Sequence, residues 1–597
     1  MNNVAIAAAF TDIARFLQLK NDSIFKIRAY QRAADIIQGL DFDLNEVRTR
    51  PELLAGIPGI GDAISAKITE LVETGRLEYL EKLKSEFPPA LLPVLDVTGI
   101  GPKTAMMVVT ELGLKTVDDL EKAIASGALA ALPRIGERNA ERILRHFKAL
   151  AEPKRRTIGE ALPAAEGVMR ALSAACPDVR KLTVAGALRR WQETIGDIDL
   201  VCVADDPAAV TRAFSKLPIV TEILGQGDTQ ASVIVAPGFQ VDLRVVADAH
   251  FASLLLYFTG SQQHTAQLRT AAQKLGLSLN EYGLTDQSGK LHEFESEAAL
   301  YEHLGFAYVE PELREGQDEL AAATSGSLPA LISLSDIRGD LHTHSNWTDG
   351  DSTIDVMVAE AEKRGIEYIA ITDHSVSRAI SNGLSVDRLR LHRAQIESIR
   401  LKKPGIKVLC GSEIDILADG SLDYSDEVLA GLDVVAASVH SAMGQKLEIM
   451  TERIIRAMRN PHVTVVGHLT TRMLPHRGRP EGREPIEADL DALFRAAADT
   501  GTLLEINASP SRLDLKDTHV RRASQLGARF VISTDAHSTA GLDDMKYGVG
   551  TARRGWCAPS LVMNTLAADE FTDFLKTPKP ERGKWKPGRG RSDNQRG

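Results

Sequence analysis

Short apolar runs that end in acidic or histidine residues fill the C-terminal part of the chain and constrain its fold more than any other feature. Tyr368–Ile371 and Phe530–Ser533 are two such runs, and each is followed closely by an aspartate and a histidine. Helical patterns separate the runs. Alternating strands and helices favour a parallel sheet covered by helices, and the carboxyl ends of its strands form one face. The pattern predicts an α/β barrel with a polar site at that face.

Polar groups recur at these expected strand ends. A lone histidine is more often a buried structural group or a surface group, but so many strand-end groups meeting at one face favour a site. Imidazole and carboxylate ligands together suit Zn²⁺, Mn²⁺ or Fe²⁺. The segments are Asp340–His344, followed by Asp349 in a loop, and Thr372–His374, Gly411–Glu413, Ser438–His440, Gly467–His468 and Thr534–His537.

These motifs resemble the PHP (polymerase and histidinol phosphatase) domain over about residues 336–570. The resemblance implies a (β/α)7-like barrel whose metal ions activate water for attack on a phosphate ester. An inactive structural PHP domain is the alternative, but such domains usually lack some ligands and none is missing here. The resemblance implies up to three Mn²⁺ or Zn²⁺ ions, one pair bridged by Glu413, and nine ligands: His342, His344, Asp349, His374, Glu413, His440, His468, Asp535 and His537.

An Asp-x-Asp motif and a distant third aspartate form a second candidate site. Gly196–Asp199 opens an expected strand, in which period-two alternation puts Asp197 and Asp199 on one face, and Asp242 lies in another expected strand. Clustered carboxylates are costly unless cations neutralise them, and two Mg²⁺ ions about 3.5–4 Å apart would do so. An Asp-x-Asp at the surface is the common alternative.

Further motifs set the aspartates in context. Gly186–Arg190 before Gly196–Asp199, then Tyr257–Ser261 and Asn280–Tyr282, resemble family X DNA polymerases, the DNA polymerase beta family, over about residues 1–318. The resemblance implies a DNA-directed polymerase with catalytic metal ligands Asp197, Asp199 and Asp242, the last nearest the primer hydroxyl. Its other implied roles are phosphate contacts at Gly186, Arg190 and Gly196, a sugar and base pocket at Tyr257, Phe258 and Gly260, and a place near the templating base for Arg269.

The nucleotide site departs from the family pattern at four positions. Ala187 and Ile195 stand where phosphate-binding serines are usual in animal members, and Gln262 and Thr265 replace an aspartate and an asparagine of the pocket. Each lost contact is worth about 1–3 kcal/mol. We therefore expect weaker nucleotide binding with the chemistry retained.

The first 155 residues read as helices broken by glycine-rich turns. Ile57–Gly61 and Val97–Gly101 share a hydrophobic-x-Gly-hydrophobic-Gly turn, and Leu132–Gly136 is a weaker copy. The free amides of such a turn and the next helix N-terminus favour phosphate. The copies resemble the helix-hairpin-helix motif, with helix packing as the alternative. The resemblance implies contacts with the DNA backbone at Gly59, Gly61, Gly99 and Gly101.

Two residues near the first turn resemble functional residues of the polymerase family. Lys67 matches a lyase lysine that forms a Schiff base with an abasic sugar, and Tyr30 matches a DNA-contacting tyrosine. A lyase lysine needs a depressed pKa. Because Asp62 and Glu70 lie nearby in sequence and favour the charged form, a solvated or phosphate-contacting lysine is the favoured interpretation.

Composition narrows the remaining choices. A chain of 597 residues is too long for one core. Its four cysteines form no CxxC pair, which argues against disulfides or a cysteine zinc site. No signal-like N-terminus and no membrane-spanning apolar run is present, so we expect a cytoplasmic protein. We also expect it to be nucleoid-associated and a monomer. The net charge of −11 argues mildly against a wholly basic nucleic-acid binder, although backbone-amide contacts to phosphate leave DNA binding open.

The expected function combines these parts. We expect a polymerase that fills short gaps in base excision repair, with gapped or nicked DNA and dNTPs as partners, and a 3′→5′ exonuclease with AP endonuclease or 3′-phosphatase activity as extensions. The alternatives are a DNA-end-binding scaffold with a weak polymerase and a small-molecule phosphatase such as histidinol phosphatase. The expected domains are helix-hairpin-helix regions at 1–80 and 81–155, a palm at 156–250, a thumb at 251–318, a linker at 319–335, the PHP domain at 336–575 and a basic disordered tail at 576–597.

Overall fold

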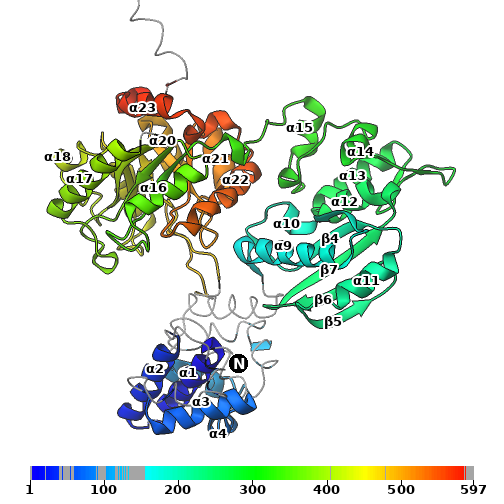
Figure 1. Ribbon diagram of the computed structural model, residues 1–597, viewed down its shortest axis with the longest axis horizontal. Helices are drawn as coiled ribbons and strands as arrows, with labels where there is room; N and C mark the ends of the chain where they lie inside the picture. The colour runs from blue at the N-terminus through cyan, green and yellow to red at the C-terminus, as the bar shows by residue number, and fades with distance from the viewer. Residues whose placement is uncertain are drawn as a thin grey trace, which may run out of the picture. The chain divides into compact units, whose positions relative to one another are not determined.

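The chain forms two compact units, Met1–Lys154 and Arg155–Gly597, in a computed structural model (Figure 1). Within the described residues no helix has the length and apolar character needed to cross a membrane. Gly59, Gly99 and Gly101 lie outside these residues. The structure describes residues 3–20, 22–38, 60–88, 102–114, 155–403, 405–476 and 481–583, with a few single positions outside these ranges.

The first unit is helical, as the glycine-punctuated sequence predicts. Its core lies between the paired helices α1 and α2, whose apolar residues recur at helical spacing, and includes Phe10, Phe16 and Tyr30. Gly61 precedes α3 with an extended backbone, and Gly75 ends it in the left-handed conformation (φ 72°). The described helices are α1 (Asn3–Leu19), α2 (Ile24–Gln38), α3 (Asp62–Thr74), α4 (Glu78–Ser85) and α6 (Pro102–Glu111).

The second unit begins with a palm-like sheet. Its described strands have the order β2-β4-β7-β6-β5, with β4 and β7 parallel and side by side (Figure 1). Alternate residues of β4 and β7 pack against α9 and α11 and form the core of this region. The elements are β1 (Arg156–Thr157), α9 (Ile158–Ala175), β2 (Arg180–Val184), α10 (Gly186–Arg189), β3 (Thr194–Ile195), β4 (Ile198–Val203), α11 (Pro207–Ser215), β5 (Val220–Gln226), β6 (Gln230–Val235) and β7 (Phe239–Val246).

A small α+β region follows and corrects the expected linker. Residues 319–325, assigned to a linker at 319–335, form the helix α15, in which the carboxylate of Glu319 is fully buried and bonds His264 Nδ1 at 2.7 Å. The small residues of this segment are compatible with a linker or a helix, and the buried contact with His264 favours the helix. The elements are α12 (Phe251–Thr259), α13 (Gln262–Lys274), β8 (Ser278–Asn280), β9 (Gly283–Thr285), β10 (Leu291–His292), α14 (Glu297–His303) and α15 (Glu319–Ser325).

The C-terminal region confirms the expected barrel-like architecture. Its described strands form a seven-stranded parallel sheet in sequence order, and a parallel bridge between Thr343 and Ala536 brings the first strand beside the last. Every residue of β11 and β12 is buried because helices cover the outside and side chains fill the inside. The strands are β11 (Gly339–Thr343), β12 (Tyr368–Ile371), β13 (Lys407–Asp415), β14 (Val434–Ser438), β15 (Val465–Val466), β16 (Leu503–Asn507) and β17 (Phe530–Ser533).

Helices follow most of these strands, and one lies inside the expected disordered tail. Lys579 of α24 is buried and donates to the carbonyl oxygens of Met458 and Asn460, so the tail assigned from residue 576 begins with ordered chain. The helices are α16 (Ile354–Lys363), α17 (Val386–Lys402), α18 (Asp426–Leu429), α19 (Leu447–Arg459), α20 (Leu490–Thr500), α21 (Asp517–Gln525), α22 (Met545–Arg554), α23 (Ala568–Lys576) and α24 (Lys579–Arg582).

Candidate active sites

The palm-like sheet brings three distant carboxylates together. Asp199 in β4 is directly opposite Asp242 in β7, and Asp197 lies just before β4. One carboxylate oxygen from each lies within 4.8 Å of the others. Sheet alternation explains the position, because the neighbours of Asp199 and Asp242 in each strand point to the opposite face and form the core. The strand that was expected to open at Gly196 starts at Ile198.

The turn before this site is built closely around Asp199. Gly186 has a positive φ of 58°, and a Cβ added there would lie 2.0 Å from Asp199 Oδ2. A larger residue would therefore displace the carboxylate. Arg190, at the end of the same turn, donates through Nε to Glu315 Oε1 at 3.0 Å and through Nη1 to the Thr259 carbonyl.

Burial and nearby negative charge raise the pKa of Asp199. Burial, followed by repulsion from Asp197 and Asp242, raises its pKa to about 7, while Arg190 opposes the shift. Crowded carboxylates of this kind become favourable when cations share them. The donor set and the spacing of the three aspartates thus fit divalent cations with oxygen preference.

The other expected nucleotide-pocket residues lie on neighbouring helices. Tyr257 and Phe258 end α12 with their ring centroids 6.1 Å apart, and the Arg269 guanidinium lies 5.0 Å from the Tyr257 ring. A Cβ on Gly260 would lie 3.2 Å from Arg190 Nη1. Gly196 is near Arg155, with 3.6 Å between an added Cβ and Arg155 Nη1.

Two of the four departures from the family pattern are buried. Ile195 is 0% exposed in the palm core, and Thr265 is 7% exposed with no partner for its hydroxyl among the described residues. Both side chains are therefore largely withdrawn from solvent, from which a nucleotide would approach. The expectation of weaker nucleotide binding consequently rests on Ala187 and Gln262.

In the helical unit, Tyr30 and Lys67 both contact the Tyr79 ring but differ in burial. Tyr30 is only 7% exposed and packs on Phe10 and Tyr79, with ring centroids 5.9 and 6.3 Å away. Lys67 lies at the surface of α3, where Nζ donates to the Ala63 carbonyl at 3.2 Å and lies 5.2 Å from the Tyr79 ring. Among the described residues, an added Cβ on Gly61 would meet nothing within 4 Å.

In the barrel, the nine candidate ligands lie at or just beyond the carboxyl ends of the strands. Two histidines and two carboxylates come from β11, β13 and the loop after β11: His342, His344, Asp349 and Glu413. The other five ligands follow β12, β14, β15 and β17. Among the described residues, eight of the nine contribute ligand atoms to three groups, each within 4.8 Å. His468 is in none of the groups but lies 2.8 Å from the Glu413 carboxylate. The groups are His344, Asp349, His374 and His537; His342, His344 and Asp535; and His374, Glu413 and His440.

Glu413 occupies the centre of these groups and is fully buried. Its Oε2 is 2.9 Å from His374 Nδ1 and 3.4 Å from His342 Nε2. Its Oε1 is 2.8 Å from His468 Nε2 and 3.2 Å from His440 Nε2. A carboxylate that uses both oxygens toward opposite sides can bridge two cations.

The unsatisfied atoms of the barrel site fit metal ligation. His342 Nε2, both ring nitrogens of His344 and Glu413 Oε2 are buried without a hydrogen-bond partner among the described residues. Buried polar atoms are otherwise nearly always paired. Burial alone would raise the pKa of Glu413, but the facing histidines, His440 first, hold it well below its usual range.

Two of the nine candidate ligands have an unusual backbone conformation. His468 and Asp535 have positive φ angles of 24° and 55°, a region that residues with a side chain seldom adopt. Such conformations persist where the surrounding structure enforces them, and they concentrate at functional sites.

Two carboxylates that the sequence reasoning missed orient the ligands. Glu505 in β16 accepts from His342 Nδ1 at 2.7 Å and from the His468 amide at 2.7 Å, and Asp415 accepts from His440 Nδ1 at 2.6 Å. A carboxylate on the second nitrogen fixes the ring of a metal-binding histidine. Glu505 had a local signal, since it is an acidic residue between the apolar Leu504 and Ile506.

Replacing Glu505 with glutamine is expected to weaken metal binding about 10- to 100-fold, because His342 loses its orienting carboxylate. The measurement is a titration of metal-free protein with Mn²⁺, in which phosphodiesterase activity is recorded at each Mn²⁺ concentration. Excess Mn²⁺ should restore the rate. An unchanged Mn²⁺ dependence would contradict the role.

Comparisons with known proteins follow the same division. Four stretches match described families: a helix-hairpin-helix domain at residues 1–77, a SAM-like helix-hairpin-helix tandem at 91–149, the DNA polymerase beta thumb at 254–315 and the PHP domain at 340–509. The chain is 36% identical over 580 residues to the DNA polymerase/3′-5′ exonuclease PolX of Bacillus subtilis (strain 168), covering 96% of this chain and 100% of that protein. The chain belongs to the PolX family of DNA polymerase/3′-5′ exonucleases.

This PolX family member also resembles two proteins over about two fifths of its length. It is 26% identical over 255 residues to a probable phosphatase of Thermoanaerobacter sp. (strain X514), covering 41% of this chain and 96% of that protein. It is 28% identical over 250 residues to a probable phosphatase of Syntrophotalea carbinolica, covering 40% of this chain and 95% of that protein.

Proposed function

We propose that this PolX family member fills short gaps in DNA during base excision repair and trims 3′ ends with its barrel. The observation that carries the proposal is a pair of separate cation sites on one chain, one of three aspartates and one of histidines around Glu413. The first suits transfer of a nucleotide, and the second suits hydrolysis of a phosphodiester.

In the palm, Asp197, Asp199 and Asp242 would hold two Mg²⁺ ions. When bound, these ions supply charge neutralisation for the triphosphate and the attacking 3′-hydroxyl. Asp242 would lie nearest that hydroxyl. Phosphate contacts are assigned to Gly186, Arg190 and Gly196, the sugar and base pocket to Tyr257, Phe258 and Gly260, and a position near the template to Arg269.

In the barrel, the nine ligands would hold up to three ions, Mn²⁺ or Zn²⁺, with Glu413 shared by one pair. Such ions supply an activated water and hold phosphate oxygens. Glu505 and Asp415 keep their histidines aimed at the site by accepting the Nδ1 proton. AP endonuclease or 3′-phosphatase activity would use the same groups.

Contacts with gapped or nicked DNA are assigned to the helix-hairpin-helix regions. The extended backbone of Gly61 before the N-terminus of α3 supports a backbone phosphate contact there. We assign Lys67, in the same helix, to a phosphate contact, with lyase chemistry as the alternative. We further propose that the enzyme acts as a monomer on chromosomal DNA in the cytoplasm.

Purified protein tests this function directly on two substrates. A labelled primer in a short gap, with Mg²⁺ and dNTPs, should be extended. The same primer without dNTPs, with Mn²⁺, should be shortened from its 3′ end. Histidinol phosphate is the competing substrate, because the barrel resembles probable phosphatases. Rapid hydrolysis of histidinol phosphate with an intact primer would overturn the exonuclease assignment.

The raised pKa of Asp199 predicts how Mg²⁺ dependence changes with pH. The pKa of Asp199 is raised to about 7. Below pH 7 a proton on this carboxylate competes with the cation, and above pH 7 the carboxylate is ionised and free to bind it. The Mg²⁺ concentration for half-maximal extension should rise about tenfold from pH 8 to pH 6. Initial rates across a Mg²⁺ series at both pH values measure this, and equal midpoints would contradict it.

A further inference from the structure

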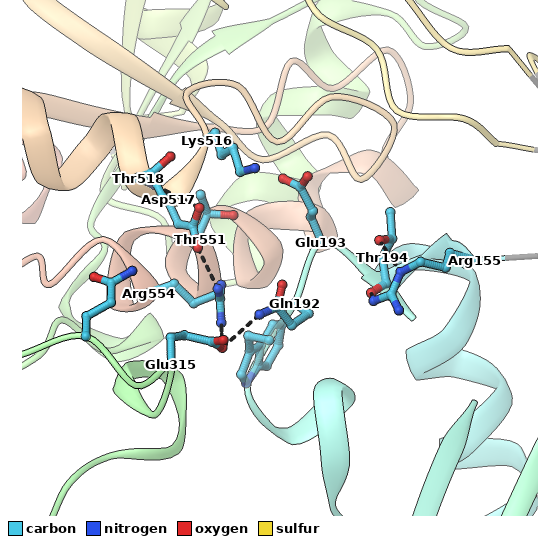
Figure 2. A pocket seen from close by; sticks show the side chains of 12 residues that line it. Arg155, Gln192, Glu193, Thr194, Glu315, Lys516, Asp517, Thr518, Thr551 and Arg554 are labelled. Atoms are coloured by element: carbon cyan, nitrogen blue, oxygen red, sulfur yellow. Dashed lines mark hydrogen bonds and ion pairs between the residues drawn. The ribbon is translucent and has the colours of Figure 1, made fainter. Parts of the chain in front are cut away.

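The barrel contacts the palm and thumb through a buried charge network at Arg554, the last residue of α22. The Arg554 side chain is 7% exposed and lies between Asp517 of the barrel and Glu315 of the thumb (Figure 2). Its Nη1 donates to Glu315 Oε1 and to the Arg190 carbonyl, both at 2.8 Å, and its Nη2 lies 2.6 Å from Asp517 Oδ2. The network borders a cavity of about 410 Å³.

A single oxygen of Glu315 receives three donors. Arg554 Nη1 is 2.8 Å, Gln192 Nε2 is 2.7 Å and Arg190 Nε is 3.0 Å from Oε1. Figure 2 shows Gln192 and Arg554 approaching this oxygen from the palm and from the barrel. The two arginines therefore share one carboxylate, and a change at either alters the charge that faces the other.

This shared carboxylate connects the barrel to the nucleotide site. Arg190 ends the turn that begins at Gly186, and its Nη1 also donates to the Thr259 carbonyl beside Gly260. Two donors of Arg190 are thus engaged, Nε by Glu315 and Nη1 by the carbonyl next to the pocket residue Gly260. Movement of the guanidinium toward a phosphate would loosen its hold on Glu315.

We propose that Arg554 of the barrel is a positioning residue for nucleotide addition, because it neutralises Glu315 and so leaves Arg190 available to the triphosphate. The inference rests on the proposed role of Arg190 in binding nucleotide. Without Arg554, the full charge of Glu315 faces Arg190. Arg190 is then held more tightly, and the potential near the triphosphate becomes more negative. Both effects weaken binding of a dNTP.

The experiment measures KM and kcat for single-nucleotide gap filling by the full chain. Arg554→Ala should raise the KM for dNTP about five- to tenfold, with a smaller change in kcat. Arg554→Ala combined with Glu315→Gln should return KM to within about twofold of wild type, because the unneutralised charge is gone. A loss of domain packing alone would not be rescued by the second change.

Arg521→Ala is the matched control. Arg521 joins the barrel to the thumb through Asp318 at 2.6 Å and lies 3.9 Å from the Trp556 ring, but none of these contacts includes Glu315 or Arg190. It should leave KM unchanged. Exonuclease rates and thermal unfolding of all variants show whether each one is folded.

Each outcome decides between specific claims. If wild type extends the primer and Arg554→Ala raises KM no more than Arg521→Ala does, the positioning role is overturned and the polymerase function stands. A double variant with KM as high as Arg554→Ala also overturns it. If wild type adds no nucleotide at all, the proposed function itself fails and takes this inference with it.

Discussion

Replacing Asp197 and Asp199 together with alanine is expected to slow primer extension at least about a thousand-fold while 3′ trimming continues at the wild-type rate. Loss of these oxygens leaves Asp242 as the only member of the three-aspartate group, which is too few ligands for two cations. Positioned cations contribute several kcal/mol to stabilisation of the transition state, and about 4 kcal/mol corresponds to a thousand-fold in rate. Extension and trimming of the same labelled gapped substrate measure both activities.

The matched control for this variant is Asp205→Ala. Asp205 lies two residues beyond β4 in the same palm, but its side chain is 87% exposed and pairs with Arg180 at the surface. It should extend primers normally, since exposed ion pairs contribute little to stability. If the double variant still extends the primer at a tenth of the wild-type rate, the three-aspartate site is not the polymerase centre. Loss of trimming as well would point to misfolding, which thermal unfolding detects.

Replacing Glu413 with glutamine is expected to abolish the 3′→5′ exonuclease, again by at least about a thousand-fold, and to leave primer extension intact. Glutamine has nearly the same shape but no charge, so it cannot bridge two cations from the centre of the histidine cluster. His374, His440 and His468 lie within 3.2 Å of the Glu413 carboxylate and would lose their shared anion. Elemental analysis should show fewer metal ions per chain.

Glu360→Gln provides the control for this barrel variant. Glu360 lies on α16 in the same domain, and its carboxylate pairs with Arg364 at the outer surface. Both metal content and trimming should match wild type. His342→Ala should reproduce the loss seen with Glu413→Gln, because His342 faces the same carboxylate from β11. Persistent trimming in both His342→Ala and Glu413→Gln would place the nuclease elsewhere on the chain.

Local sequence was informative where polar residues interrupt a strand pattern. The apolar run before His374 and the one before Asp535 are strands, as expected, and β4 and β7 carry Asp199 and Asp242. These signals are short-range: alternation and apolar run length indicate a strand, and its end shows where a polar side chain emerges. Glu505 was overlooked because it lies inside a strand, although its charge among apolar neighbours marked it.

Long-range contacts decided the rest. Tyr30 is polar enough to contact DNA, but helix packing buries it against Phe10. Residues 319–325 have a composition suited to a linker, and the buried bond between Glu319 and His264 makes them a helix. In both cases the partner is distant in sequence, so no local pattern carried the information.

The sequence by itself determined the α/β barrel, the strands that carry the acidic and imidazole groups, and the identity of those groups, because periodicity and side-chain chemistry are properties of short segments. Only the tertiary structure decided that Asp199 pairs in register with Asp242, that Glu413 lies among the histidines, and that Arg554 and Arg190 share Glu315. Those facts depend on which distant segments pack together, and packing is chosen by the whole buried surface at once.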